Sequence, residues 1–235
     1  MDNLVLILAE VVSALLCFTL VRFMMKPYQY MGESRYIGLP LGFAFLGMSY
    51  IFMGLALYFE TSLFIEEEIK WLQLFTQAYA FAFLAVTYYF SKKGSEHSRL
   101  RWRITFAGLI FAAVASYLVV FEHPMFGLPS YKTVDEYFRF FNIICVLYIT
   151  IHTLRSHASK PDPKTIWVPL SYLLLGFSQY SYLICSLDES FSAFIGAHIL
   201  RLAGLLVFLF VAYQTFYGRR NMRREEEILN EEASA

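Results

Sequence analysis

The chain has 235 residues, of which 58% are hydrophobic and 16% are charged, and its formal net charge is zero. Soluble domains carry about 25% charged residues, and this apolar composition excludes a disordered chain, a collagen and a disulfide scaffold. The balanced charge gives no reason to expect nucleic acid as a partner.

The hydrophobic residues are gathered into seven long blocks, separated by polar, charged or proline-bearing segments. Each block approaches the length of about 20 helical residues that crosses a hydrocarbon core about 30 Å thick. The outer helices of a soluble bundle need polar faces, whereas these blocks are apolar nearly all round. We therefore predict an all-α integral membrane protein, a seven-transmembrane-helix bundle with the lipid bilayer around it. In chain order the predicted spans cover residues 4–25, 37–59, 71–90, 104–121, 137–154, 166–187 and 191–217, and residues 218–235 form a tail.

The basic residues predict the orientation. Most of the 19 Lys and Arg lie in the segments after the first, third, fifth and seventh spans. The other segments hold only Lys70, Lys132 and Arg139, and Arg201 alone lies inside a span. Because Lys and Arg concentrate on the cytoplasmic side of membrane proteins, we expect the N-terminus outside and the C-terminus in the cytoplasm. The expected location is the cell (plasma) membrane, as a multi-pass protein.

The tail has a basic part followed by an acidic part. It reads GRRNMRREEEILNEEASA. We expect its arginines to lie against anionic headgroups, and its acidic residues to project away as a continuing helix.

Polar side chains on five of the predicted helices fall at one depth in the outer half of the bundle, counted at about 1.5 Å per residue. A charged side chain in hydrocarbon costs about 3 kcal/mol, so Glu10 and Arg201 should face the bundle interior and pair directly or through His198. Two interpretations stay open: an ion pair that fixes helix packing, and an outward-facing polar cavity that binds a small ligand, ion or proton. The predicted layer comprises Glu10, Gln77, Asn142, Gln179, His198 and Arg201.

Several chemical classes can be compared with these residues. Retinal needs a lysine within a span, and all the lysines lie outside the spans. A haem held by two histidines needs both at one depth, but His198 lies in the outer half and His152 near the inner end. The three cysteines have no metal-type spacing. We predict no cofactor, no metal site and no evident catalytic machinery, and keep a redox subunit binding haem or quinone near His198 as a further alternative.

The end of the chain resembles a known kind of segment. The run HILRLAGLLVFLFVAYQTFYGRRNMRREEEILNEE is similar to the last helix and exit linker of seven-transmembrane sensory input domains in prokaryotic histidine kinases and related receptors. In those families this helix passes a signal from the membrane to an output domain. Because the 235 residues contain no output domain, the resemblance implies a separate cytoplasmic signalling partner at the tail. The hypothesis is a sensory or regulatory membrane module, and the alternative is a small secondary transporter that uses the same polar layer.

Three pairs of small residues have the spacing that lets membrane helices approach closely. They are Gly38 with Gly42, Ala78 with Ala82, and Ala193 with Ala197. Each pair would serve either packing within the chain or the seam of a homo-oligomer.

Overall fold

The computed structural model describes residues 3–31, 37–59, 63–91, 96–122, 131–159, 165–188 and 190–234, and the regular structure in these ranges is helical. Seven of these helices are long and apolar enough to cross a membrane. The predicted all-α, seven-helix membrane fold is confirmed at this level. The helices are α1 (Asn3–Met31), α2 (Gly38–Tyr58), α3 (Leu63–Ser91), α4 (Glu96–Phe121), α6 (Tyr131–Ser159), α7 (Trp167–Asp188) and α8 (Phe191–Ser234).

Two helices begin with a proline in the first turn. Pro40 follows the start of α2 at Gly38, and Pro169 follows the start of α7 at Trp167. The first backbone N–H groups of a helix have no partner within the helix, so a proline at this end removes little.

The fourth and fifth spans are longer than the sequence predicts. The stretches suited to a membrane run over Arg99–Phe121 in α4 and Val134–Ser159 in α6. Arg139, which the count of basic residues assigns to a segment outside the spans although the predicted span 137–154 includes it, lies inside the stretch Val134–Ser159. Arg139 is 5% exposed, and the buried carboxylate of Asp135 on the same helix balances its charge.

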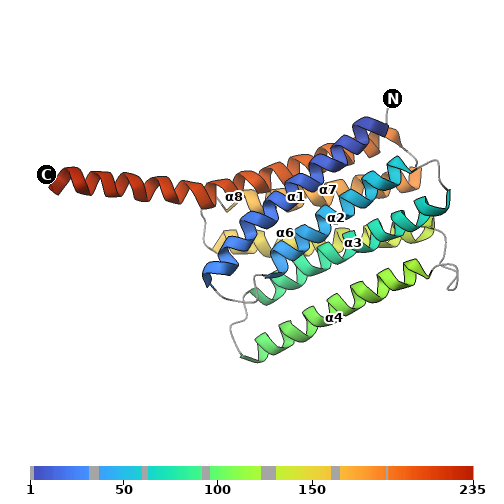
Figure 1. Cartoon of the computed structure of the whole chain (residues 1–235), viewed down its shortest axis with the longest axis horizontal. Coiled ribbons are helices and arrows are strands. Elements are labelled where there is room, and N and C mark those ends of the chain that lie inside the picture. The colour runs from blue at the N-terminus through green and yellow to red at the C-terminus, as the bar shows by residue number, and fades with distance from the viewer. Residues whose placement is uncertain are drawn as a thin grey trace.

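Six helices form a closed ring. Neighbours around it are α1 and α2, α2 and α3, α3 and α6, α6 and α7, α7 and α8, and finally α8 and α1. Helix α4 packs on α3, outside this ring (Figure 1). Two hydrogen bonds tie α4 to α3: Tyr79 to Ser116 at 2.8 Å and Thr76 to Tyr117 at 2.9 Å between their hydroxyl oxygens.

The core fills the centre of the ring and draws on all six of its helices. In it, the Phe208 ring of α8 meets Tyr172 of α7 and Phe43 of α2, with ring centroids 4.6 and 5.4 Å apart. Both contacts have the edge-to-face geometry that aromatic rings prefer. This packed layer separates the two ends of the bundle, and the polar site lies on one side of it.

Two of the three pairs of small residues serve contacts within the chain. A Cβ atom on Gly42 would lie 2.6 Å from Leu84 Cγ, and one on Gly38 would collide with Thr87, so both glycines allow α2 to approach α3 closely. The Ala197 carbonyl of α8 accepts a hydrogen bond of 2.8 Å from the Ser178 hydroxyl of α7.

The third pair, Ala78 with Ala82 on α3, has a different setting. It lines an apolar pocket of about 370 Å³ together with side chains of α4 and α6, such as Leu109 and Phe138.

Helix α8 is 44 residues long, and Phe191–Thr215 is the part suited to crossing a membrane. The rest continues as one helix away from the bundle, at the end opposite the N-terminus (Figure 1). The continuing helix of the tail is thus present, whereas the predicted headgroup contacts of its arginines involve side chains outside the described set.

Candidate functional site

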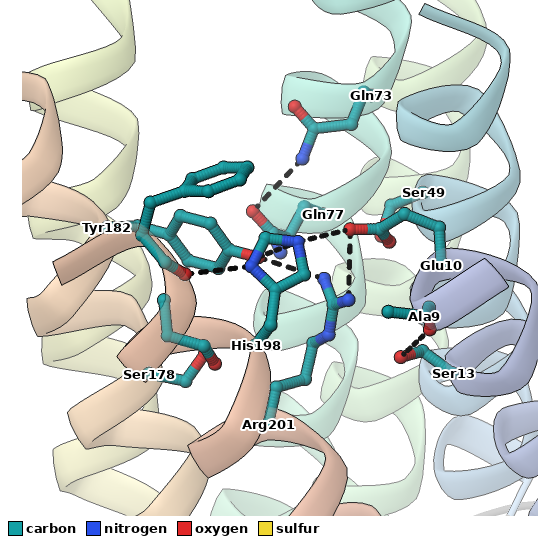
Figure 2. A network of polar contacts seen from close by, with 12 residues as sticks. Ala9, Glu10, Ser13, Ser49, Gln73, Gln77, Ser178, Tyr182, His198 and Arg201 are labelled. Atoms are coloured by element: carbon teal, nitrogen blue, oxygen red, sulfur yellow. Dashed lines mark hydrogen bonds and ion pairs between the residues drawn. The ribbon is translucent and has the colours of Figure 1, made fainter. Parts of the chain in front are cut away.

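A buried ion pair joins the first and last helices. Arg201 NH2 of α8 lies 2.9 Å from Glu10 Oε1 of α1, and these side chains are 2% and 0% exposed. His198, one turn before Arg201 on the same face, places its Nε2 atom 3.1 Å from the same carboxylate oxygen (Figure 2). The direct pairing predicted for Glu10 and Arg201 is present, and His198 joins it.

The hydrogen bonds of His198 fix the position of its ring. Its Nδ1 lies 2.8 Å from the Phe194 carbonyl oxygen, which can only accept, so Nδ1 carries a hydrogen. A hydrogen bond between Nε2 and Glu10 then needs a second proton, on the imidazole or on the carboxyl group. His198 therefore joins the Phe194 carbonyl of its own helix to the Glu10 carboxyl group of α1.

Tyr182 of α7 extends this centre toward α6. Its hydroxyl oxygen accepts a hydrogen bond of 3.1 Å from Arg201 NH1 and lies 3.3 Å from the ring nitrogens of His198. The Arg139 guanidinium lies over the Tyr182 ring, with its carbon atom 4.8 Å from the ring centroid. In the same way Arg201 lies 4.4 Å from the ring centroid of Tyr50 on α2. Both buried cations thus gain cation–π contacts with desolvated tyrosines.

Arg139 forms the second charged centre. Its Nε donates to Asp135 Oδ1 at 3.0 Å, one turn earlier on α6, and its NH1 donates to Gln77 Oε1 of α3 at 2.7 Å. Gln77 also accepts a weaker bond of 3.4 Å from Gln73. At the start of α6, burial and the nearby Asp135 carboxylate raise the pKa of the Tyr131 hydroxyl. That hydroxyl stays protonated and donates to Asp135 at 3.3 Å.

The last two predicted residues bond to each other. Asn142 Nδ2 of α6 donates to Gln179 Oε1 of α7 at 3.3 Å, and both side chains are buried. This bond joins neighbouring helices of the ring.

A pocket opens beside the charged centres. It has a volume of about 330 Å³ and lies between α2, α6, α7 and α8. Arg139, Asp135 and Tyr182 form part of its wall, so the pocket reaches the buried network directly. We call it the Arg139–Tyr182 pocket. The remaining lining residues are Met53, Tyr131, Lys132, Cys185, Ser186 and Phe194.

Some polar atoms of the network are buried without a hydrogen bond to any described protein atom. They include Glu10 Oε2, Arg201 Nε and the Tyr50 hydroxyl. Buried polar atoms are nearly always satisfied by protein or by ordered water. The centre therefore has capacity to bind a further polar group.

All six residues of the predicted layer are buried, with exposed fractions of 4% or less. The structure joins Glu10, His198 and Arg201 in one cluster, and it places Gln77 and the Asn142–Gln179 pair in two separate contacts.

The layer also contains residues that sequence reasoning missed. Arg139 and Tyr182 link Gln77 to the cluster of Glu10, His198 and Arg201, and the sequence holds a signal for each of them. Arg139 follows Asp135 at the spacing of an ion pair on a helix, and Tyr182 follows Gln179 at the spacing that puts both on one face.

The geometry of His198 bears on the haem alternative. Both of its ring nitrogens lie within hydrogen-bonding distance of protein oxygens, so an iron ligand at this position would have to replace one of these bonds. Among the described residues, no group of three or more His, Cys, Asp or Glu side chains is arranged to hold a metal ion. The site is a buried, hydrogen-bonded cluster of charged side chains with a pocket beside it.

Comparison with known proteins gives no relative: no family model, no curated protein and no solved structure matches the chain.

Proposed function

We propose that this protein is a membrane sensory module, which binds a small ligand in the Arg139–Tyr182 pocket and transmits binding through α8 to the tail. The observation that supports this proposal is that Tyr182 belongs both to the pocket and to the buried network. It lines the pocket, and its hydroxyl bonds to Arg201 and His198 on α8. A molecule that competes for Tyr182 or Arg139 would change the bonds that hold α8.

The pocket suits a ligand with a charged group and an apolar part. Arg139 and Lys132 offer positive charge, Asp135 offers negative charge, and the rings of Tyr182 and Phe194 supply apolar surface. Its volume of about 330 Å³ is at the lower end for small-molecule sites, about 300–1,000 Å³. Amino acids, small carboxylates and aromatic amines have this size and chemistry.

The transmission step uses the length of α8. A ligand shifts a conformational equilibrium only when it binds one state better than the other. A ligand that bonds to Tyr182 would meet this condition, because it would compete with Arg201 and His198 for the same hydroxyl. Helix shifts of about 1–2 Å are common in signalling proteins. Because α8 is continuous from His198 to Ser234, a shift at the pocket would move the tail.

In this proposal the N-terminus and the pocket face the outside and the tail lies in the cytoplasm of a cell whose plasma membrane holds the bundle. The distribution of Lys and Arg supports this orientation. A signalling partner would bind the tail, as the resemblance to sensory input domains implies.

A binding screen tests the proposal. Purified protein in detergent is heated with a panel of amino acids, small carboxylates and aromatic amines, and a ligand is recognised by a rise in its unfolding temperature. Tyr182→Phe, which keeps the ring and removes the hydroxyl, should weaken the rise. Tyr180→Phe is the matched control, because Tyr180 lies on the same helix and is 53% exposed.

Signalling is measured separately, as hydrogen exchange in residues 216–234 with and without the ligand. A ligand that binds and alters exchange in this tail supports the sensor. A ligand that binds, leaves the tail unchanged and crosses the membrane of proteoliposomes would replace the sensor with a carrier.

A further inference from the structure

A second pocket lies at the other end of the bundle, on the side from which α8 continues. It has a volume of about 490 Å³ and is formed by the end of α3, the end of α6 and the start of α7. The packed core separates it from the Arg139–Tyr182 pocket, so it takes no part in the proposed function. We call it the end pocket. Its lining residues are Tyr88, Ser91, His152, Thr153, Ser156, His157, Thr165 and Val168.

Seven of the eight residues that line the end pocket carry a hydroxyl or an imidazole group, although most of the pocket surface is apolar. Val168 is the one lining residue without a polar side-chain atom, and no described lining residue is acidic. Hydroxyls and imidazoles can donate hydrogen bonds, and a wall without carboxylates does not repel an anion. The chemistry of this wall favours an oxyanion.

Two of these groups can donate a hydrogen bond to a ligand. The Tyr172 hydroxyl donates to the Tyr88 hydroxyl at 3.2 Å, which leaves the Tyr88 proton to be donated to another group. His157 Nδ1 lies 2.6 Å from Thr165 Oγ1. When Thr165 donates in this bond, His157 carries its hydrogen on Nε2.

The residues that adjoin the lining residues in the sequence include several lysines. Lys92 and Lys93 directly follow Ser91 of the pocket wall, and Lys160 and Lys164 lie between the end of α6 and Thr165. Glu96 and Asp162 are the acids in the same stretches, so the bases predominate. Lysine is a common partner of phosphate in proteins.

We propose that the end pocket binds a phosphoryl group, which belongs either to the headgroup of an anionic lipid or to free phosphate. A phosphoryl group presents three strong acceptor oxygens, enough for Tyr88, His157 and Ser156 to donate together. The position at the helix ends also corresponds to the level at which lipid headgroups meet a membrane protein.

The test compares two probes on the whole protein. Binding of inorganic phosphate is measured by titration calorimetry in detergent, and binding of phosphatidic acid is measured by native mass spectrometry against phosphatidylcholine. The variants are Ser156→Ala and His157→Gln, which alter partly or fully exposed side chains. Ser159→Ala is the control, because Ser159 is exposed on the same helix, does not line the pocket, and donates to the Arg155 carbonyl.

We expect each pocket variant to weaken binding about tenfold, equivalent to about 1.4 kcal/mol, and Ser159→Ala to leave it unchanged. If phosphatidic acid binds in this way and inorganic phosphate does not, the phosphoryl group is that of a lipid. The reverse result assigns the pocket to free phosphate. The proposal is overturned if neither probe binds, or if the pocket variants bind as tightly as the control. A ligand of the Arg139–Tyr182 pocket should still bind to the Ser156→Ala and His157→Gln variants. Such a result shows that failure of one proposal leaves the other intact.

Discussion

The Glu10 carboxylate on the first helix and the Arg201 guanidinium on the last lie 2.9 Å apart and are almost inaccessible to solvent. Because α1 and α8 are neighbours in the ring, this contact closes it. The two residues are far apart in the sequence, so the pair can form only when the first and the last helix have packed against each other. It is thus both a packing element and the centre of the polar network.

Removing one partner of this pair should be costly. Glu10→Gln leaves the Arg201 charge buried without a counter-charge, and breaking a buried ion pair costs about 3–5 kcal/mol. We expect unfolding of Glu10→Gln in mixed detergent micelles to show a loss of about 3 kcal/mol. The double variant Glu10→Gln with Arg201→Met should recover most of it, because it removes both charges.

The control for this comparison is Glu122→Gln. Glu122 follows the end of α4 and is exposed, so its neutralisation should change stability little. Equal stability of Glu10→Gln and Glu122→Gln would show that the buried pair contributes nothing.

The two glutamines of α3 should differ in their effect. Gln77 accepts a bond of 2.7 Å from the Arg139 guanidinium, whereas Gln73 makes a bond of 3.4 Å and its own oxygen is buried without a partner among the described atoms. Bonds to charged groups contribute about 1.5–3 kcal/mol, so Gln77→Leu should lower the free energy of unfolding by about 2 kcal/mol. Gln73→Leu should lower it much less, and the reverse order would contradict the assigned network.

The charged pair could be predicted from the sequence because of its energetic cost. Glu10 and Arg201 interrupt apolar blocks, and a charge within a span requires a partner. Tyr182 gave a weaker signal, since a tyrosine in a membrane helix is ordinary. Arg139 was misplaced because it lies close to the predicted end of its span, where an arginine is normally at the surface. Its burial depends on Asp135 and Gln77, and a contact with another helix is not visible in one segment of sequence.

The arrangement of helices could not be predicted in the same way. In the membrane-spanning part of α3, 67% of the residues are buried, whereas in that of α4 only 17% are buried. The mean hydropathy of α4 is nevertheless the higher of the two. Hydropathy in a membrane protein partly reports contact with lipid, which is itself apolar. The hydrophobic blocks of the sequence therefore predict the number of helices, but not which helices are neighbours. The position of α4 outside the ring depends on contacts between helices.

Two glycines provide a matched test of the α2–α3 contact. A Cβ atom on Gly42 would lie 2.6 and 2.7 Å from atoms of Leu84 and 3.2 Å from the Ala80 carbonyl oxygen, whereas one on Gly108 meets nothing within 4 Å. Overpacking costs about 1–3 kcal/mol, so Gly42→Ala should destabilise the protein by about that amount. Gly108→Ala should be neutral or stabilising by about 0.5–1 kcal/mol, the usual gain in a helix. Thermal unfolding in detergent distinguishes the two, and similar unfolding temperatures would argue against this packing.

The three cysteines report on the pocket and on the core. Cys17 is fully buried and Cys145 is 8% exposed, while Cys185 is more accessible and lines the Arg139–Tyr182 pocket. A thiol must be reached by the reagent before it can react, so N-ethylmaleimide should modify Cys185 first in the folded protein. Mass spectrometry of the intact chain should then show one adduct, and three after unfolding in dodecyl sulfate. A pocket ligand should slow the single modification, because it fills the space beside the sulfur. Equal rates at Cys17 and Cys185 in the folded protein would mean that the ring of helices opens in solution, and that the buried network is not permanently closed.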